Sequence, residues 1–393
     1  MPQRGPAPTV GTLLDMLALS LGGAVALGFA RFAYALLLPV MRADLGWSFT
    51  LSGAMNAANA LGYLIGALGA TALSGRLGLK RVFTGGLLLT AVSLLLCALT
   101  AHSGALMILR LLAGVGGALV FVSGGGLAAL AARSHPERSA LLLGVFYGGS
   151  GIGIMLSALL LPPLLAGGWR GAWVALGAAS LGCLLLTLRP LTRCPDRGAG
   201  GADAQASAPL RPLAWTLAAY TCFGVGYIAY MTFIVAFLRA SGAGALVTPF
   251  WAVLGAAVVA SPVVWRSLAT HAPGARAMAV QMLTLATGAA LPLLSIHPMI
   301  LFTSGILFGV SFLAVVTFTT IITRRVLPEQ AWARGIAAFT VLFAAGQVTG
   351  PLLTGALADT AGGLRLGLGV SAAVLLLGAA LALRQPAEAQ PST

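Results

Sequence analysis

Charged residues are scarce in this chain of 393 residues, and acidic residues are the scarcest of them. Charged side chains make up 8% of the sequence, with 8 Asp and Glu against 22 Lys and Arg, whereas 59% of the residues are hydrophobic. The mean hydropathy is +0.98. A soluble domain of this length does not need so much apolar surface. The composition therefore indicates an integral membrane protein.

Cysteine is also rare, and its four positions show no paired spacing. Cys97, Cys183 and Cys222 fall in apolar stretches and Cys194 in a polar one, so we expect no disulfide and no metal site. Lys80 is the only lysine, which excludes a phosphate-binding loop of the Gly-x-x-x-x-Gly-Lys type. We therefore expect no cofactor, and ATP is excluded as an energy source.

Long apolar stretches recur along the whole chain, each ending in a short polar turn. None alternates in the manner of a barrel strand, so helices are the expected spanning elements. The first stretch is too long for a signal peptide and is interpreted as a span. We predict twelve spans, at residues 12–40, 48–74, 79–101, 105–132, 139–165, 171–189, 213–238, 247–269, 277–296, 299–323, 335–358 and 365–384.

A polar interval at 190–211 predicts a linker between two six-helix bundles, one at 1–189 and the other at 212–393. An offset of 196 residues aligns the two halves at three separate places without a gap, which indicates a duplicated, pseudo-symmetric unit. The aligned pairs are Gly28 with Gly224, Ala33 with Ala229, Tyr34 with Tyr230, Gly78 with Gly274, Lys80 with Arg276, and Arg138 with Arg334.

The formal charge of +14 is spread over separate loops, which argues against a nucleic-acid partner. With the N-terminus inside, sixteen basic residues fall on the inner side and only four, Arg42, Arg170, Arg239 and Arg365, on the outer side. Since cytoplasmic loops carry the excess of Lys and Arg, we expect both termini and the linker in the cytoplasm.

Two motifs and the plan of six plus six spans resemble the major facilitator superfamily. The loop from Gly75 to Arg81 is similar to the superfamily motif of Asp-Arg-x-Gly-Arg-Arg type, with Gly75 at the acidic position. The stretch from Arg110 to Gly116 is similar to its Arg-x-x-x-Gly-x-Gly motif. The phrase Gly-Phe-Ala-Arg-Phe-Ala-Tyr from Gly28 resembles the bacterial YbfB/YjiJ group.

This resemblance implies an all-α integral membrane protein with the major facilitator fold, in a bacterial inner membrane, and we expect a monomer. It also implies that the loop motif takes part in conformational change. Its residues here are Arg76, Gly78 and Lys80, for which simple topogenic charge is the alternative. On the inner side, Arg76 and Lys80 can pair with helix C-terminal carbonyls and with lipid phosphates.

Arg31 and Arg110 are the two ionisable residues that lie clearly inside predicted spans. All eight acids and all four histidines map to tails, loops or span ends, and Asp15 is roughly 24 Å along the helix from Arg31 at 1.5 Å rise per residue. An embedded arginine needs an anionic or accepting partner. Two fixed positive charges without a carboxylate favour an anionic substrate. In the superfamily the first and fourth spans line the central cavity, so both guanidinium groups could face one anion.

Other embedded polar residues complete the predicted site. Asn56, Asn59 and Tyr63 share a helix face, as do Tyr220, Tyr227 and Tyr230. Bonding between helices is the alternative for the asparagines, and packing is the alternative for the tyrosines. We predict that the substrate-binding residues are Arg31, Arg110, Tyr34, Asn56, Asn59, Tyr147, Tyr227, Tyr230 and Gln347.

These observations predict a transporter of a small organic anion, secondary or facilitative, that works by rocker-switch alternating access. Efflux of amphipathic drugs or metabolites by proton antiport is the alternative within transporters. An intramembrane enzyme is a different class, suggested by Gly148-Gly149-Ser150-Gly151, which matches the phrase of rhomboid-type serine proteases. No histidine is embedded to act as the base for Ser150, so we expect no enzyme activity.

Overall fold

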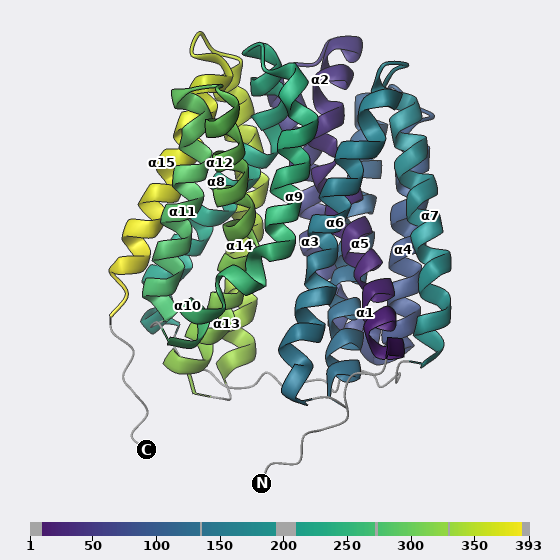
Figure 1. Cartoon of the computed structure of the whole chain (residues 1–393), viewed down its shortest axis with the longest axis vertical. Coiled ribbons are helices and arrows are strands. Elements are labelled where there is room, and N and C mark those ends of the chain that lie inside the picture. Colours follow the sequence, from purple (N-terminus) through teal and green to yellow (C-terminus); the bar gives the residue numbers. More distant parts are fainter. Residues whose placement is uncertain (1–9, 134–135, 194–209, 272–273, 329–330, 387–393) are drawn as a thin grey trace. The chain divides into compact units, whose positions relative to one another are not determined.

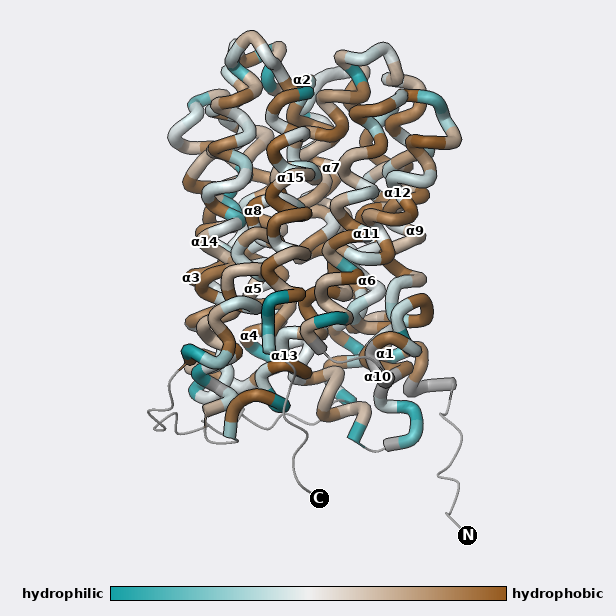
Figure 2. Tube along the Cα trace, turned by 90° about the vertical axis from the view of Figure 1, so that its left-hand side faces the viewer, coloured by the Kyte–Doolittle hydropathy of each residue, from teal (hydrophilic) through white to brown (hydrophobic). Residues whose placement is uncertain are grey.

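The computed structural model describes residues 10–133, 136–193, 210–271, 274–328 and 331–386. Most of the predicted linker, residues 194–209, lies outside them. The described residues form helices joined by short turns, and no strand occurs among them (Figure 1). Figure 2 shows hydrophilic segments concentrated near helix ends and hydrophobic segments along the helix lengths. This distribution is that of a membrane protein.

Twelve helical segments among the described residues are long and apolar enough to cross a membrane. This confirms the predicted all-α class and the number of spans. The segments are Leu13–Leu45, Phe49–Leu77, Leu79–Cys97, Ser103–Ala132, Leu141–Leu165, Trp169–Arg193, Arg211–Ala240, Gly244–Leu268, Ala275–Leu294, Pro298–Val326, Arg334–Ala358 and Gly363–Leu383.

The chain divides into two compact units. The first comprises residues 1–40 and 62–201, and the second comprises residues 41–61 and 202–393. The division falls within two helices, α2 (Tyr34–Leu45) and α3 (Phe49–Leu77). The opening turns of α3 pack with the second unit, whereas the remainder of α3 packs with the first.

The first unit is built around the first span, which changes its helical geometry twice. Its elements are α1 (Val10–Gly23), the π-helix η1 (Ala24–Phe32), the start of α2 (Tyr34–Leu45), the end of α3, α4 (Leu79–Cys97), α5 (Ser103–Ala132), η2 (Pro136–Arg138), α6 (Ser139–Leu165) and α7 (Trp169–Arg193). η1 packs against α5 and α6, and α4 packs against α5 and α7.

Glycine allows the π-helix to approach α6 closely. A Cβ atom on Gly28 would lie 2.5 Å from the Gly153 Cα, and one on Gly153 would lie 2.4 Å from the Ala24 carbonyl oxygen. Any larger residue would push the two backbones apart. The close contact holds η1 in place at the depth where Arg31 occurs.

The second unit is organised around α8, which packs against α14 and α15. Its elements are the end of α2, the start of α3, η3 (Arg211–Leu213), α8 (Ala214–Ala240), η4 (Gly244–Leu246), α9 (Val247–Val264), α10 (Arg266–His271), α11 (Gly274–Leu294), α12 (Pro298–Phe312), α13 (Ala314–Val326), α14 (Trp332–Ala358) and α15 (Gly363–Leu383).

A carboxylate at the end of α14 caps the start of α3. Asp359 accepts hydrogen bonds from the Phe49 and Thr50 backbone N–H groups at 2.8 and 2.9 Å, and from the Thr50 hydroxyl at 2.7 Å. The Arg42 guanidinium lies 3.8 Å from the Phe49 ring centroid. Since the first N–H groups of a helix lack partners inside it, the remote carboxylate satisfies two of them.

Candidate functional site

Arg31 lies at the end of the π-helix, and its side chain is 2% exposed. The Ala33 N–H donates to the Gly28 carbonyl at 2.8 Å, a bond five residues back along the chain. π-helical geometry is rare in proteins and occurs frequently at functional sites. The guanidinium Cζ lies 5.4 Å from the Tyr63 ring centroid and 5.9 Å from that of Phe32. Its Nε and Nη2 atoms have no hydrogen-bond partner among the described residues.

Arg110, in α5, is 1% exposed and is held by the first span. Its Nη1 donates to the Ala30 carbonyl at 2.5 Å, one residue before Arg31. Its Cζ lies 4.8 Å from the Tyr34 ring centroid and 5.5 Å from that of Trp173 in α7. The like charges of Arg110 and Arg31 are close enough to interact. Arg110 is thus engaged by the protein, with two aromatic rings stabilising its charge.

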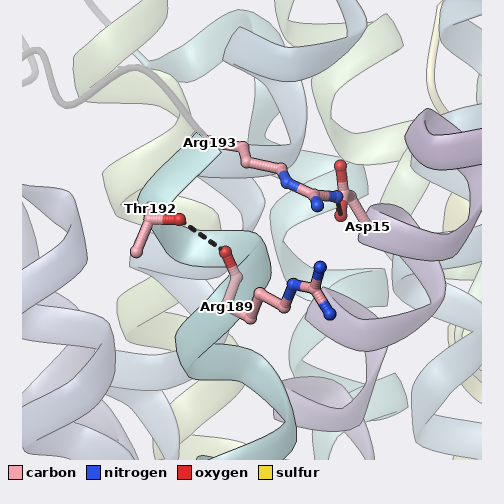
Figure 3. A network of polar contacts seen from close by, with 4 residues as sticks. All are labelled: Asp15, Arg189, Thr192 and Arg193. Atoms are coloured by element: carbon pink, nitrogen blue, oxygen red, sulfur yellow. Dashed lines mark hydrogen bonds and ion pairs between the residues drawn. The ribbon is translucent and has the colours of Figure 1, made fainter.

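Arg31 and Arg110 are the only charged side chains among the described residues that are buried. Asp15, sixteen residues before Arg31 in the first span, pairs with Arg193 at the end of α7, with an N–O distance of 3.2 Å (Figure 3). The Asp15 carboxylate is therefore engaged by Arg193 at one end of the first unit. The electrostatics of the buried region are therefore positive.

The predicted polar face of α3 is divided between the two units. Tyr63 faces Arg31 in the first unit. Asn56 is 3% exposed, and its amide donates to the Thr232 hydroxyl of α8 at 2.5 Å within the second unit. Asn59 is 1% exposed and belongs to the second unit as well. The hydrogen bond of Asn56 joins two helices, which is the alternative to substrate binding that the sequence offered for this residue.

Tyr227 and Gln347 meet inside the second unit, where the Gln347 Nε2 donates to the Tyr227 hydroxyl. The Gln347 Oε1 is buried and has no partner among the described residues. The Tyr227 ring stacks on Phe223 at 4.8 Å, Phe343 at 5.6 Å and Phe312 at 5.9 Å between centroids. This aromatic stack continues through Phe223 and Phe343 to Tyr220.

Tyr230 extends the stack in the other direction and is fully buried. Its ring lies 4.2 Å from that of Phe308, and its hydroxyl is 2.8 Å from the Ser304 hydroxyl. Ser304 donates its single hydrogen to the Gly288 carbonyl at 2.6 Å. Tyr230 is therefore the donor to Ser304.

Tyr147 lies apart from these contacts. It is 42% exposed, and its ring packs on Phe121 at 5.5 Å and Phe146 at 5.1 Å. No contact among the described residues joins Tyr147 to either buried arginine.

The loop motif forms the tight turn between α3 and α4. Arg76 is exposed in the last turn of α3, and Gly78 has φ of 86°, a conformation that favours glycine. Lys80 follows in the first turn of α4. The motif therefore places its basic groups at one end of a span.

Sequence reasoning missed the π-helix and the aromatic partner Trp173. The π register has no period of its own in the sequence, although the glycines at Gly28 and Gly153 were a signal of close backbone approach. Trp173 lies 63 residues from Arg110, and nothing local links the two. Thr232 and Ser304, the partners of Asn56 and Tyr230, were missed for the same reason.

A family model described as "Uncharacterised MFS-type transporter YbfB" matches residues 23–383. The match spans every element of the site. No protein of curated function matches the sequence.

Solved structures of transporters share the fold at low sequence identity. A bacterial homolog of the human lysosomal transporter Spinster, inward-facing and unoccupied, has a TM-score of 0.70 and 13% identity, covering 98% of this chain and 100% of its own. The nucleoside transporter NupG has a TM-score of 0.76 and 13% identity, covering 95% and 100%. The same Spinster homolog, occupied, has a TM-score of 0.69 and 14% identity, covering 96% and 98%. These likenesses show the fold.

Proposed function

Because this chain belongs to the family of MFS-type transporters of the YbfB type, we propose that it moves a small organic anion across the membrane. Transport would proceed by alternating access, with the substrate site near the midplane exposed first to one side and then to the other.

One observation carries the proposal: two donor nitrogens of the buried Arg31 guanidinium, Nε and Nη2, have no hydrogen-bond partner in the part of the chain that the structure describes. An arginine keeps its charge in proteins, and a buried charge without a partner is costly. An anion that accepts both donors would remove this cost. A carboxylate, sulfonate or phosphate matches the planar fork of the guanidinium in charge and geometry.

The two arginines have different roles in this proposal. Arg31 contacts the substrate, whereas Arg110 fixes the Ala30 carbonyl and so holds the turn that presents Arg31. Tyr63, beside the guanidinium, would contact the bound anion or its organic part. In the second unit, Gln347 presents next to Tyr227 an amide oxygen that has no hydrogen-bond partner within the described segments. Tyr34, Asn56, Asn59 and Tyr230 would support the site through their buried contacts, and Tyr147 is the weakest member.

Coupling of transport to protons depends on which acids are buried. No Asp or Glu is buried among the described residues, so no carboxylate there is placed to carry a proton across. Uniport, anion exchange or entry of the proton on the substrate itself are the compatible modes. We place the protein in the bacterial inner membrane, as a monomer with both termini in the cytoplasm.

The aromatic stack favours a second candidate, efflux of amphipathic drugs or metabolites. Five of its rings, those of Tyr220, Phe223, Tyr227, Phe312 and Phe343, are arranged with interplanar angles below 30°. Such a stack suits a large apolar substrate. Proton antiport would still require an acid or histidine that the described spans do not bury.

We propose no enzyme activity at Ser150. Its hydroxyl is buried and has no hydrogen-bond partner among the described residues, so no base there activates it.

A thermal-shift screen tests the proposal with purified protein against small carboxylates, sulfonates, phosphates and lipophilic cations. A ligand that binds the folded state raises its apparent stability. We expect one anion class to raise the melting temperature and Arg31→Gln to abolish that shift. The matched control is Arg170→Gln, which changes an arginine at the end of a span. Stabilisation by lipophilic cations alone would favour efflux and refute the anion site.

A further inference from the structure

The first unit carries a groove between α3 and α5 that plays no part in the anion site. Its volume is about 260 Å³. It is lined by Ile65, Gly66, Gly69, Ala72, Leu73, Arg76, Val115 and Leu119. Seven of these residues are apolar or glycine, and the one charged residue, Arg76, stands at the end of α3. We propose that this groove binds an acyl chain of an anionic phospholipid whose phosphate contacts Arg76.

The floor of the groove is left open by one glycine. A Cβ atom on Gly66 would lie 2.5 Å from the Val115 carbonyl oxygen, so there α3 and α5 touch. A Cβ atom on Gly69 would meet nothing within 4 Å. The two helices thus touch at Gly66 and leave space beside Gly69, and the neighbouring Ile65 side chain is 51% exposed. An apolar surface of this kind within a span accommodates hydrocarbon.

The charged end of the groove has the chemistry of a phosphate site. Arg76 is exposed, and Gly78 turns the chain directly into α4, whose N-terminus has no side-chain cap. The first turn of α4 contains Lys80 and Arg81 and no acid. A helix N-terminus with adjacent basic side chains favours an anion.

The loop motif supplies no carboxylate of its own at this positive end. Residues 74–81 contain no Asp or Glu, because Gly75 occupies the position at which the superfamily motif carries an acid. A phospholipid phosphate would supply the missing negative charge. Basic residues next to a span attract anionic lipids in this way.

The distance between the open space at Gly69 and the charged end at Arg76 fits one lipid molecule. Gly69 and Arg76 are seven residues apart, roughly 10 Å along the helix at 1.5 Å per residue. The open floor therefore lies about two turns deeper in the membrane than the charged end. A phosphate at Arg76 would place the upper part of an acyl chain beside Gly69. Long side chains at helix ends lie at this headgroup level.

Two variants separate the two parts of the proposed site. Gly69→Leu fills the groove, and the open space around Gly69 allows the side chain without a backbone clash. Arg76→Gln removes the charge. The matched controls are Gly182→Leu in α7, where a Cβ atom also meets nothing within 4 Å, and Arg276→Gln, the counterpart of Lys80 in the second half of the chain.

The measurement is lipid retention by native mass spectrometry, with phosphatidylglycerol or phosphatidylcholine of identical chains titrated into the full-length detergent-purified protein. We expect preferential retention of phosphatidylglycerol, weakened roughly fivefold by Arg76→Gln because its contact with the lipid phosphate is lost. We expect Gly69→Leu to weaken retention as well, and neither control to do so.

Equal retention of the two lipids would overturn the charge assignment, and unchanged retention in Gly69→Leu would overturn the acyl groove. Glycerol phosphate, which has no acyl chain, provides the remaining comparison. If it displaced phosphatidylglycerol at similar concentrations, the site would recognise the phosphate alone and the groove would have no role.

Discussion

At the scale of single residues, the two buried arginines differ in what surrounds them. Both guanidinium groups lie near two aromatic rings, but Arg110 also donates to a carbonyl, whereas the Nε and Nη2 atoms of Arg31 have no hydrogen-bond partner among the described residues. The same residue type therefore stabilises the protein at one position and is poised for a ligand at the other. A buried charge with partners and one without them respond in opposite ways to removal.

This difference predicts opposite effects of two substitutions in ligand-free protein. Arg110→Gln should lower the unfolding free energy by about 1.5–3 kcal/mol, the contribution of a hydrogen bond to a charged group. Arg31→Gln should raise the melting temperature, because it removes a buried charge whose Nε and Nη2 atoms have no hydrogen-bond partner among the described residues. Thermal unfolding in one detergent measures both. A destabilised Arg31→Gln protein would show that Arg31 is structural.

At the scale of elements, the π-helix is positioned by glycine contacts. We predict that Gly28→Ala lowers the unfolding free energy by about 1–3 kcal/mol, the cost of an overpacked interior. The control is Gly85→Ala in α4, whose Cβ atom would meet nothing within 4 Å. That substitution should raise the unfolding free energy by roughly 0.5–1 kcal/mol, since alanine favours a helix interior over glycine. Equal effects would contradict the close contact at Gly153.

The cap on α3 predicts a pH dependence. Partial burial acts to raise the pKa of Asp359, but hydrogen bonds from Thr50 and Phe49 and the charge of Arg42 outweigh it, so the pKa lies below the ordinary value. The stabilisation is therefore complete above the unfolded-state pKa of about 3.9 and is lost as the pH falls through the native pKa.

Asp359→Asn removes the titrating group from this cap. We expect it to lower the melting temperature at pH 7 and to flatten the loss of stability between pH 5 and pH 3, both measured by thermal unfolding in the same detergent. A variant that kept the wild-type slope over this interval would assign that slope to other carboxyl groups.

At the scale of the whole molecule, the distribution of basic residues predicts the orientation in the membrane. Cysteines introduced at Ala101, between two spans, and at Ala245, in the first turn of the segment Gly244–Leu268, should react with an impermeant maleimide in intact cells. Cysteines at Glu137 and Arg211 should react only after permeabilisation. A background without the four native cysteines is required. Labelling of Glu137→Cys in intact cells would reverse the predicted topology.

Much of the fold was predictable from the sequence because each spanning segment must meet the requirements of the lipid bilayer by itself. Every spanning segment must satisfy its own backbone hydrogen bonds, so the number and helical nature of the spans follow from local hydropathy. The scarcity of embedded charge likewise identified Arg31 and Arg110 without any knowledge of their neighbours. The roles of the nine predicted site residues remain predictions.

The sequence by itself determined the class of protein, the twelve spans and the two arginines that need explanation. Only the tertiary structure decided which of the two is satisfied, because Ala30 and Trp173, which contact Arg110, are brought there by packing between distant helices. The same is true of the start of α3, whose contacts with Thr232 and Asp359 join it to the second unit. Hydropathy can be read from each segment alone, whereas the hydrogen-bond and aromatic partners of a residue depend on how the segments pack together.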